Sequence, residues 1–138
     1  MRITQGAFSF LPDLTEDQIK TQVEFILATG FAISIEWTDD PHPRNCYWDM
    51  WGLPLFDCKD PATVMYEIAE CIKANPAGYT KIQAFNPARG VESCASAFIV
   101  NRPANEPGFE LGRTEVAGRF QRYHIRGYAQ NGAPGERY

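Results

Sequence analysis

The strongest constraint on the fold comes from two segments in which apolar residues recur at helical spacing on one side only. Each segment places four apolar residues at positions i, i+4, i+7 and i+8: Ile19, Val23, Ile26 and Leu27 in the first, and Val64, Ile68, Cys71 and Ile72 in the second. A helix with one apolar face cannot bury that face by itself and must pack on another element. The sequence therefore predicts two amphipathic helices that cover a shared surface.

Both helical segments carry residues that are typical of helix ends. Thr15 and Gln18 form a capping box, and Gly30 suits the left-handed position after the first helix. Asp60 is suited to cap the second helix, with Pro61 at the first helical position, where a missing N–H costs nothing. We therefore expect the helices to begin directly after Thr15 and Asp60.

Four strands are expected around these helices. Phe31–Trp37 alternates apolar with polar residues, which predicts a half-buried strand. Three further strands are expected over Cys46–Trp51, Tyr79–Phe85 and Ser93–Val100. The predicted fold is an α+β two-layer sandwich, a four-stranded antiparallel sheet with two helices on one face. We expect the other face to meet water or a polar partner, because it carries Ser34, Glu36, Lys81 and Gln83.

The last part of the chain departs from this pattern. Two strand-like runs, Glu110–Val116 and Arg119–Tyr128, flank Ala117 and Gly118, which predicts a β-hairpin. Residues 102–138 contain six Arg, four Glu and no Lys. Arginine favours bidentate contacts to carboxylates, so this composition favours contact with protein. We expect two units: a domain over residues 1–105 with an extended N-terminal arm, and a C-terminal hairpin extension over residues 106–138.

The segment 47–58, Tyr-Trp-Asp-Met-Trp-Gly-Leu-Pro-Leu-Phe-Asp-Cys, is dense in large rings. Tyr and Trp combine a broad apolar face with one polar tip and are enriched at protein interfaces. A core strand leading into a loop is the alternative interpretation. The density of rings favours a surface that a partner covers, with Trp48, Trp51, Leu53 and Pro54 at this surface or directly beneath it.

No segment carries a recognisable catalytic, metal or cofactor motif. His42 and Cys46 lack a second pair of ligands, and neither glycine-rich phosphate loop is present. The net charge of −4 argues against nucleic acid or an anionic membrane as the main partner. No apolar run approaches the ~20 residues that span a bilayer. The four Cys lack CxxC spacing, which favours reduced thiols. We expect no catalytic residue, metal ligand or cofactor site.

The aromatic run resembles the Tyr-Trp-x-x-Trp-Gly-Leu-Pro-Leu-Phe-Asp segment of the small subunit of ribulose bisphosphate carboxylase/oxygenase (RuBisCO). Further stretches match in collinear order over nearly the whole chain: MRITQGAFSFLPDLT, WTDDPHPRN, DPATVMYEIAEC and AFIVNRPANEPGF. The resemblance is to red-type form I subunits of some bacteria and non-green algal plastids, which have a C-terminal hairpin. The loop over 38–45 is short, unlike that of green-type subunits. Thr80 stands where the family usually has Ile.

This resemblance implies a non-catalytic subunit that caps and stabilises an octamer of large subunits in a hetero-hexadecamer and modulates CO₂ fixation in the Calvin cycle. The active site and its Mg²⁺ then belong to the large subunit, and hairpins of neighbouring small subunits meet around an axis. Glu36 and Arg44 are expected to form ion pairs with a partner, with a solvated charge as the alternative. The residues expected to bind partners are Glu36, Arg44, Tyr47, Trp48, Trp51, Leu53, Pro54, Phe109, Arg113, Arg119, Arg122, Tyr123 and Arg126.

Two other functions are compatible with a compact α+β domain of this kind. A small-molecule-binding or regulatory module on a ferredoxin-like α+β sandwich would need a pocket with convergent polar groups, which only the polar sheet face could supply. An enzyme in its own right would need a nucleophile, a base or a metal site. For location, no targeting leader is recognised, and nine Arg against four Lys favours a bacterial cytoplasm, with the plastid stroma of a non-green alga as the alternative.

Overall fold

Helices and strands follow one another in the order that the sequence predicts. The computed structural model describes residues 13–40, 45, 47–90, 94–104 and 106–130 and, within the hairpin, the side chains of 114–118 and 120–123. The main elements are α1 (Glu16–Ala28), β1 (Ala32–Thr38), β2 (Asp49–Met50), α2 (Pro61–Ala74), β3 (Tyr79–Phe85), β4 (Cys94–Asn101), β5 (Glu106–Val116) and β6 (Phe120–Gln130). Two short 3₁₀ helices, η2 (Pro87–Arg89) and η3 (Ala117–Arg119), lie in connections.

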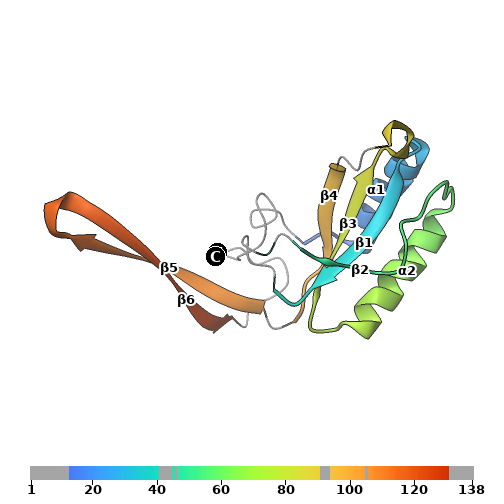
Figure 1. Cartoon of the computed structure of the whole chain (residues 1–138). Coiled ribbons are helices and arrows are strands. Elements are labelled where there is room, and N and C mark those ends of the chain that lie inside the picture. The colour runs from blue at the N-terminus through green and yellow to red at the C-terminus, as the bar shows by residue number, and fades with distance from the viewer. Residues whose placement is uncertain (1–12, 41–44, 46, 91–93, 105, 131–138) are drawn as a thin grey trace.

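Four strands form one antiparallel sheet in the order β2-β1-β3-β4. Ile82 of β3 lies opposite Ile35 of β1 and Phe98 of β4, so apolar residues meet across the centre of the sheet. Both helices cover the same face (Figure 1). The main core fills the space between these layers: Ile19, Val23, Ile26, Leu27, Ile33, Ile35, Val64, Ile68, Cys71, Ile82, Ala84 and Phe98. The predicted α+β two-layer sandwich is confirmed.

The capping box at the start of α1 forms as the sequence predicts. The Gln18 backbone N–H donates to Thr15 Oγ1 at 3.3 Å, and the Thr15 N–H donates to Gln18 Oε1 at 3.0 Å. These bonds satisfy two donors that a helix N-terminus otherwise leaves without partners. Gly30 follows the helix with φ of +79°, the left-handed conformation that glycine adopts without strain.

The second helix begins with the predicted cap and carries a polar contact on its buried face. Asp60 accepts a hydrogen bond from the Ala62 N–H at 3.0 Å, directly before the first turn at Pro61. Further along α2, the Cys71 Sγ lies 3.9 Å from the Thr80 Oγ1 of β3 in the core. Thr80 stands where the family usually has isoleucine, and its buried hydroxyl is satisfied by this contact with Cys71. Neither of the two helices described here has the length and apolar character to cross a membrane.

The centre of the sheet face opposite the helices is buried within the chain, so the expectation that water or a polar partner meets it is wrong there; Gln83 on the same face is half-buried. Ser34 is fully buried, and Glu36 and Lys81 are more than nine-tenths buried. Trp48, from the segment before β2, packs with Tyr79 and Ile99 into a second small core on this face. Alternating polar residues identify one face of a strand, but they do not show whether water reaches that face.

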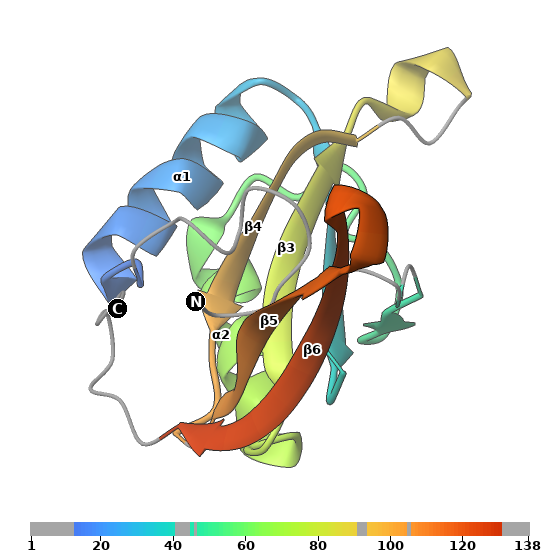
Figure 2. The ribbon, with the colours of Figure 1, turned by 90° about the vertical axis from the view of Figure 1, so that its left-hand side faces the viewer.

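The hairpin forms a separate two-stranded sheet that pairs with no strand of the sandwich. Its register runs from Glu106 opposite Gln130 to Val116 opposite Phe120, so β5 begins earlier than the predicted run. Pro107 lies within β5, where proline is tolerated because the strand has a free edge. Gly118 turns the chain with φ of +82°. The hairpin extends from the side of the sheet that faces away from the helices (Figure 2).

Candidate functional site

The aromatic segment runs along the free edge of β1 and leaves it at one place. The Trp51 N–H donates to the Ile35 carbonyl at 2.8 Å, and the Leu55 N–H donates to the Ile33 carbonyl at 2.8 Å. Between these two contacts, residues 52–54 bulge away from the sheet edge. Over residues 47–51 the predicted strand is reduced to β2, and Cys46 lies outside the described residues. The strand does not continue past this point, because Gly52 turns with φ of +66° and Pro54 has no N–H to pair.

Trp48 crosses to the sheet face that lacks helices and is buried there. The Lys81 Nζ lies 4.5 Å from the centroid of the Trp48 ring, a cation–π geometry. The Trp48 Nε1 is buried and has no hydrogen-bond partner among the residues that the structure describes. Trp48 therefore lies beneath the surface and covers the charged centre of the sheet.

Glu36 and Lys81 form a buried ion pair under this ring. The Lys81 Nζ lies 2.9 Å from the Glu36 Oε2, and the two side chains are only 9% and 11% exposed. The two residues are opposite one another in the β1–β3 register, which places them on the same face. Glu36 was expected to pair with a charge on a partner, but the structure gives it an ion-pair partner within its own chain.

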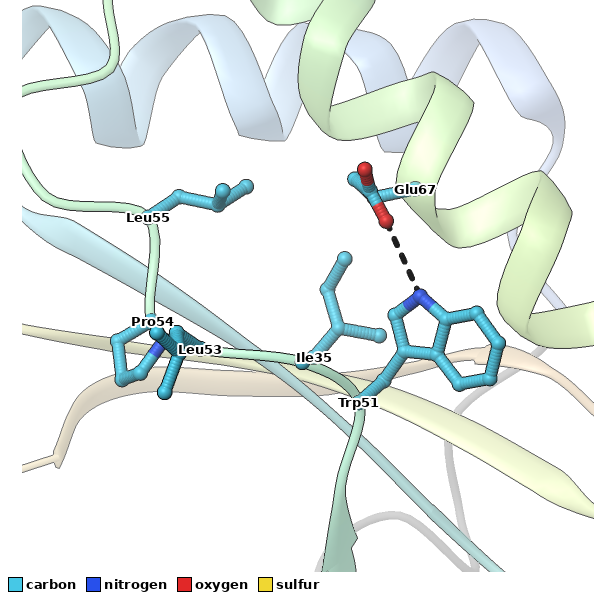
Figure 3. A pocket seen from close by; sticks show the side chains of 7 residues that line it. Ile35, Trp51, Leu53, Pro54, Leu55 and Glu67 are labelled. Atoms are coloured by element: carbon cyan, nitrogen blue, oxygen red, sulfur yellow. Dashed lines mark hydrogen bonds between the residues drawn. The ribbon is translucent and has the colours of Figure 1, made fainter.

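Trp51 lies on the other side of the sheet, next to α2. The Trp51 Nε1 donates to the Glu67 Oε2 at 3.1 Å (Figure 3). A pocket of about 280 Å³ opens beside this bond and is lined by Ile35, Trp51, Gly52, Leu53, Pro54, Leu55 and Glu67. The two tryptophans thus pack on opposite faces of the sheet, each against a charged side chain. The roles of Lys81 and Glu67 cannot be predicted from the sequence, since both contacts join residues far apart in the chain.

The side chains that this segment leaves exposed define a docking patch: Tyr47, Met50, Leu53 and Phe56. Leu53 is 84% exposed and Tyr47 is 79% exposed, although both are large. Pro54 is half-buried beside them. Large exposed apolar side chains gathered within residues 47–56 are a candidate interaction surface. The sequence predicts that Tyr47, Leu53 and Pro54 bind a partner, whereas Met50 and Phe56 are not among the predicted residues.

The predicted site residues of the hairpin lie along a ribbon separate from this patch. Tyr123 and Arg122 are exposed, as are Val116 and Phe120 near the turn. The backbone register places Arg113 opposite Tyr123. The remaining predicted residues, Phe109, Arg119 and Arg126, lie on the described backbone, whereas their side chains and the whole of Arg44 fall outside the described part of the structure.

An ion pair that sequence analysis missed fixes the chain between the sandwich and the hairpin. The Arg102 Nε lies 3.2 Å from the Asp13 Oδ1, and the Arg102 side chain is almost fully buried. Asp13 precedes α1 and Arg102 follows β4, so this pair joins the two ends of the sandwich. The Arg-rich composition after residue 101 was interpreted as contact with a partner, but Arg102 meets a carboxylate of its own chain.

The described residues offer no cluster of three or more His, Cys, Asp or Glu that could hold a metal ion. Cys58, Cys71 and Cys94 are free thiols. Burial raises the pKa of the Cys71 thiol above its ordinary value of 9.0, although hydrogen bonds from Thr80 and Asn75 act in the opposite direction. A raised pKa disfavours the nucleophilic thiolate, so Cys71 belongs to the core.

The fold is an α+β sandwich with a hairpin, and it leaves large apolar side chains exposed along residues 47–56. Residues 5–103 match the family of the ribulose bisphosphate carboxylase small chain. The chain is 63% identical to the RuBisCO small subunit of Pylaiella littoralis and 59% identical to that of Porphyra purpurea, with both proteins covered completely in each comparison. It also superposes on a chain of RuBisCO from Galdieria partita with a TM-score of 0.74 at 53% identity, again over the full length of both chains.

The chain therefore belongs to the RuBisCO small-subunit family, and the recognition made from the sequence is confirmed. As a member of this family it is the non-catalytic small subunit of a carbon-fixing holoenzyme, where it is the partner of the large subunit. The interpretation as an independent small-molecule module loses its basis. The sheet face that was to supply its site is filled by Trp48, Glu36 and Lys81.

Proposed function

We propose that this chain caps and stabilises an octamer of RuBisCO large subunits within a hetero-hexadecamer and modulates CO₂ fixation without contributing catalytic groups. The docking patch carries the proposal. Its apolar side chains are exposed to water in the single chain. The two tryptophans of the same segment are fixed within the chain, Trp48 by the cation–π contact with Lys81 and Trp51 by the hydrogen bond to Glu67. A prearranged apolar surface loses little conformational freedom on binding, which favours affinity.

The two units of the chain serve different partners in this proposal. The domain over residues 1–105 meets the large subunit through the docking patch and Pro54. The hairpin extension over residues 106–138 meets other small subunits. The separate sheet of the hairpin and its exposed Phe120 and Tyr123 support this division. A two-stranded ribbon is marginal in water by itself, so it gains stability from chains that cover it.

The hairpin arginines supply the polar part of that contact, as the sequence suggests. Arg113, Arg119, Arg122 and Arg126 can form bidentate bonds with carboxylates of neighbouring chains. The backbone register places Glu110 opposite Arg126. Mg²⁺ and the reacting groups of the holoenzyme belong to the large subunit in this proposal, and this chain acts on them through the assembly alone.

The proposed location is the plastid stroma of a non-green alga. The relatives compared include small subunits of Pylaiella littoralis, Ectocarpus siliculosus and Cyanidioschyzon merolae, all of them algae. These relatives do not support the bacterial cytoplasm that the excess of Arg over Lys favoured. The genome that carries the gene tests the location: a gene in a plastid genome supports it, and a gene in a bacterial chromosome overturns it.

Co-expression with the large subunit tests the assembly. Leu53→Ser should lower the amount of small chain retained in the complex, because the Leu53 side chain is 84% exposed and belongs to the patch rather than to the core. Phe25→Ser is the matched control, since Phe25 is 67% exposed on α1, away from the patch. Deletion of residues 106–138 should leave the sandwich folded and weaken the assembly. Full-size complexes of normal stability from both the Leu53 variant and the deletion, measured by light scattering, would refute the proposal.

A further inference from the structure

The pocket beside Trp51 has a chemistry that the docking patch does not share. Its walls are apolar, formed by Ile35, Trp51, Leu53, Pro54 and Leu55, and its one charged group is the Glu67 carboxylate. Figure 3 shows Glu67 and Trp51 on one side, Pro54 and Leu55 on the other, and Ile35 between them. The volume of about 280 Å³ lies at the lower limit for a small-molecule site and suits a single side chain.

The Glu67 carboxylate has unused capacity to accept hydrogen bonds. One oxygen accepts the Trp51 Nε1–H at 3.1 Å. A carboxylate can accept about four hydrogen bonds, so most of its lone pairs remain for another donor. Among the described residues no basic side chain forms an ion pair with Glu67, whereas Glu70, one turn further along α2, pairs with Lys73 at 3.6 Å. The Trp51 bond also fixes the direction of the carboxylate toward the pocket (Figure 3).

We propose that this pocket binds one arginine or lysine side chain of the large subunit, with its charged end on Glu67 and its aliphatic stem against Ile35, Trp51 and Leu55. This inference rests on the proposed function, because it takes the large subunit as the partner. Long basic side chains bury a stem of methylene groups and present a cation at the tip, which matches apolar walls with one carboxylate at the side.

An apolar side chain is a poorer occupant than a basic one. It would displace water from the Glu67 carboxylate and leave the charge without compensation, which is costly in an apolar site. An acidic side chain would be repelled. The pocket is also continuous with the docking patch, because Leu53 belongs to both. A partner that covers the patch therefore brings its own side chains to the mouth of the pocket.

The experiment compares holoenzymes that carry charge-neutral variants of two glutamates on the same helix. Glu67→Gln removes the charge and keeps an oxygen that can accept the Trp51 N–H. Glu70→Gln removes the same charge outside the pocket and is the matched control. Trp51→Phe removes the hydrogen bond to Glu67 and keeps the charge. Native mass spectrometry on serial dilution gives the small-subunit dissociation constant at low salt and at about 0.5 M salt, where charge contacts are screened.

Glu67→Gln should raise the dissociation constant on the order of 10-fold at low salt and flatten its salt dependence, because a charge-assisted contact is lost. Glu70→Gln should bind as the wild type does, and Trp51→Phe should keep the wild-type salt dependence. Wild-type affinity and salt dependence in Glu67→Gln would overturn the pocket assignment alone. The pocket assignment would also be overturned if Glu67→Gln and Trp51→Phe lost the same affinity and showed the same salt dependence. The loss of the Trp51–Glu67 hydrogen bond would then explain both results. Failure of the wild-type chain to join the large subunits would overturn the proposed function instead.

Discussion

Replacing Lys81 with methionine tests the energetic role of the buried ion pair. Lys81→Met keeps an unbranched side chain of similar length but removes the cation that lies 2.9 Å from Glu36 and 4.5 Å from the Trp48 ring centre. The Glu36 carboxylate, only 11% exposed, is then left without a counter-ion in a site from which water is excluded. We expect a large loss of folding stability from this single change.

The magnitude follows from the burial of both partners. Removing one member of a buried pair costs about 3–5 kcal/mol, because the other charge remains desolvated. Loss of the cation–π contact adds about 1 kcal/mol or more. A pair on the surface would cost only about 0–1 kcal/mol, so the burial in this structure decides between the two outcomes. The double variant Glu36→Gln with Lys81→Met buries no charge and should recover part of the loss.

Urea unfolding of the purified small chain, followed by tryptophan fluorescence, measures these differences as a double-mutant cycle. The coupling between Glu36 and Lys81 should reach about 2 kcal/mol or more. The control cycle uses Glu70 and Lys73, a pair in which the lysine is 78% exposed, and should give a coupling near zero. A Glu36–Lys81 coupling as small as that of the control would refute the reasoning.

Of four further predictions, the first three concern exposed Leu53 and buried Cys71, and the last concerns the activity of the chain alone. Leu53→Ser should change the unfolding free energy of the free chain by less than about 0.5 kcal/mol, because Leu53 is exposed; a large loss in the same urea assay would show that it belongs to the core. Cys71 should resist iodoacetamide at about pH 8 while exposed Cys94 reacts, as read by mass spectrometry, because burial raises the pKa of Cys71 above 9.0. The same raised pKa predicts that the stability contribution of the neutral Cys71 thiol is complete below pH 9.0 and declines as the pH rises through the folded-state pKa, which a pH series of unfolding curves measures. The chain without large subunits should show no turnover of ribulose bisphosphate, and any turnover in a radiolabelled CO₂ assay would contradict its non-catalytic role.

Local signals in the sequence were sufficient for the helices and for three strands of the sandwich. The capping box at Thr15, the cap at Asp60 and the apolar stripes act within a few residues, so they can be recognised before the fold is known. The strand over Cys46–Trp51 was overestimated, because its length depends on where the backbone leaves β1, and only the contacts at Trp51 and Leu55 decide that.

Contacts between distant residues could not be predicted in the same way. The Glu36–Lys81 pair joins β1 to β3, Trp51 meets Glu67 from α2, and Arg102 reaches Asp13. In each case a charged residue that was expected at the surface, or not considered, has a partner in its own chain. The aromatic run was correctly recognised as unusual, but which rings lie beneath the surface and which lie on it depends on the opposite directions of Trp48 and Trp51.

The two long strands of the hairpin have a consequence for how the protein is produced. Each of β5 and β6 has an outer edge that pairs with no other described strand, and Phe120 lies exposed near the turn. Unpaired strand edges are templates for aggregation, and Pro107 blocks only one position near the base of β5. A small chain made in excess of its large partner would therefore tend to aggregate through the hairpin. Balanced synthesis of the two subunits limits pairing between the hairpin edges of free small chains before they join the large subunit.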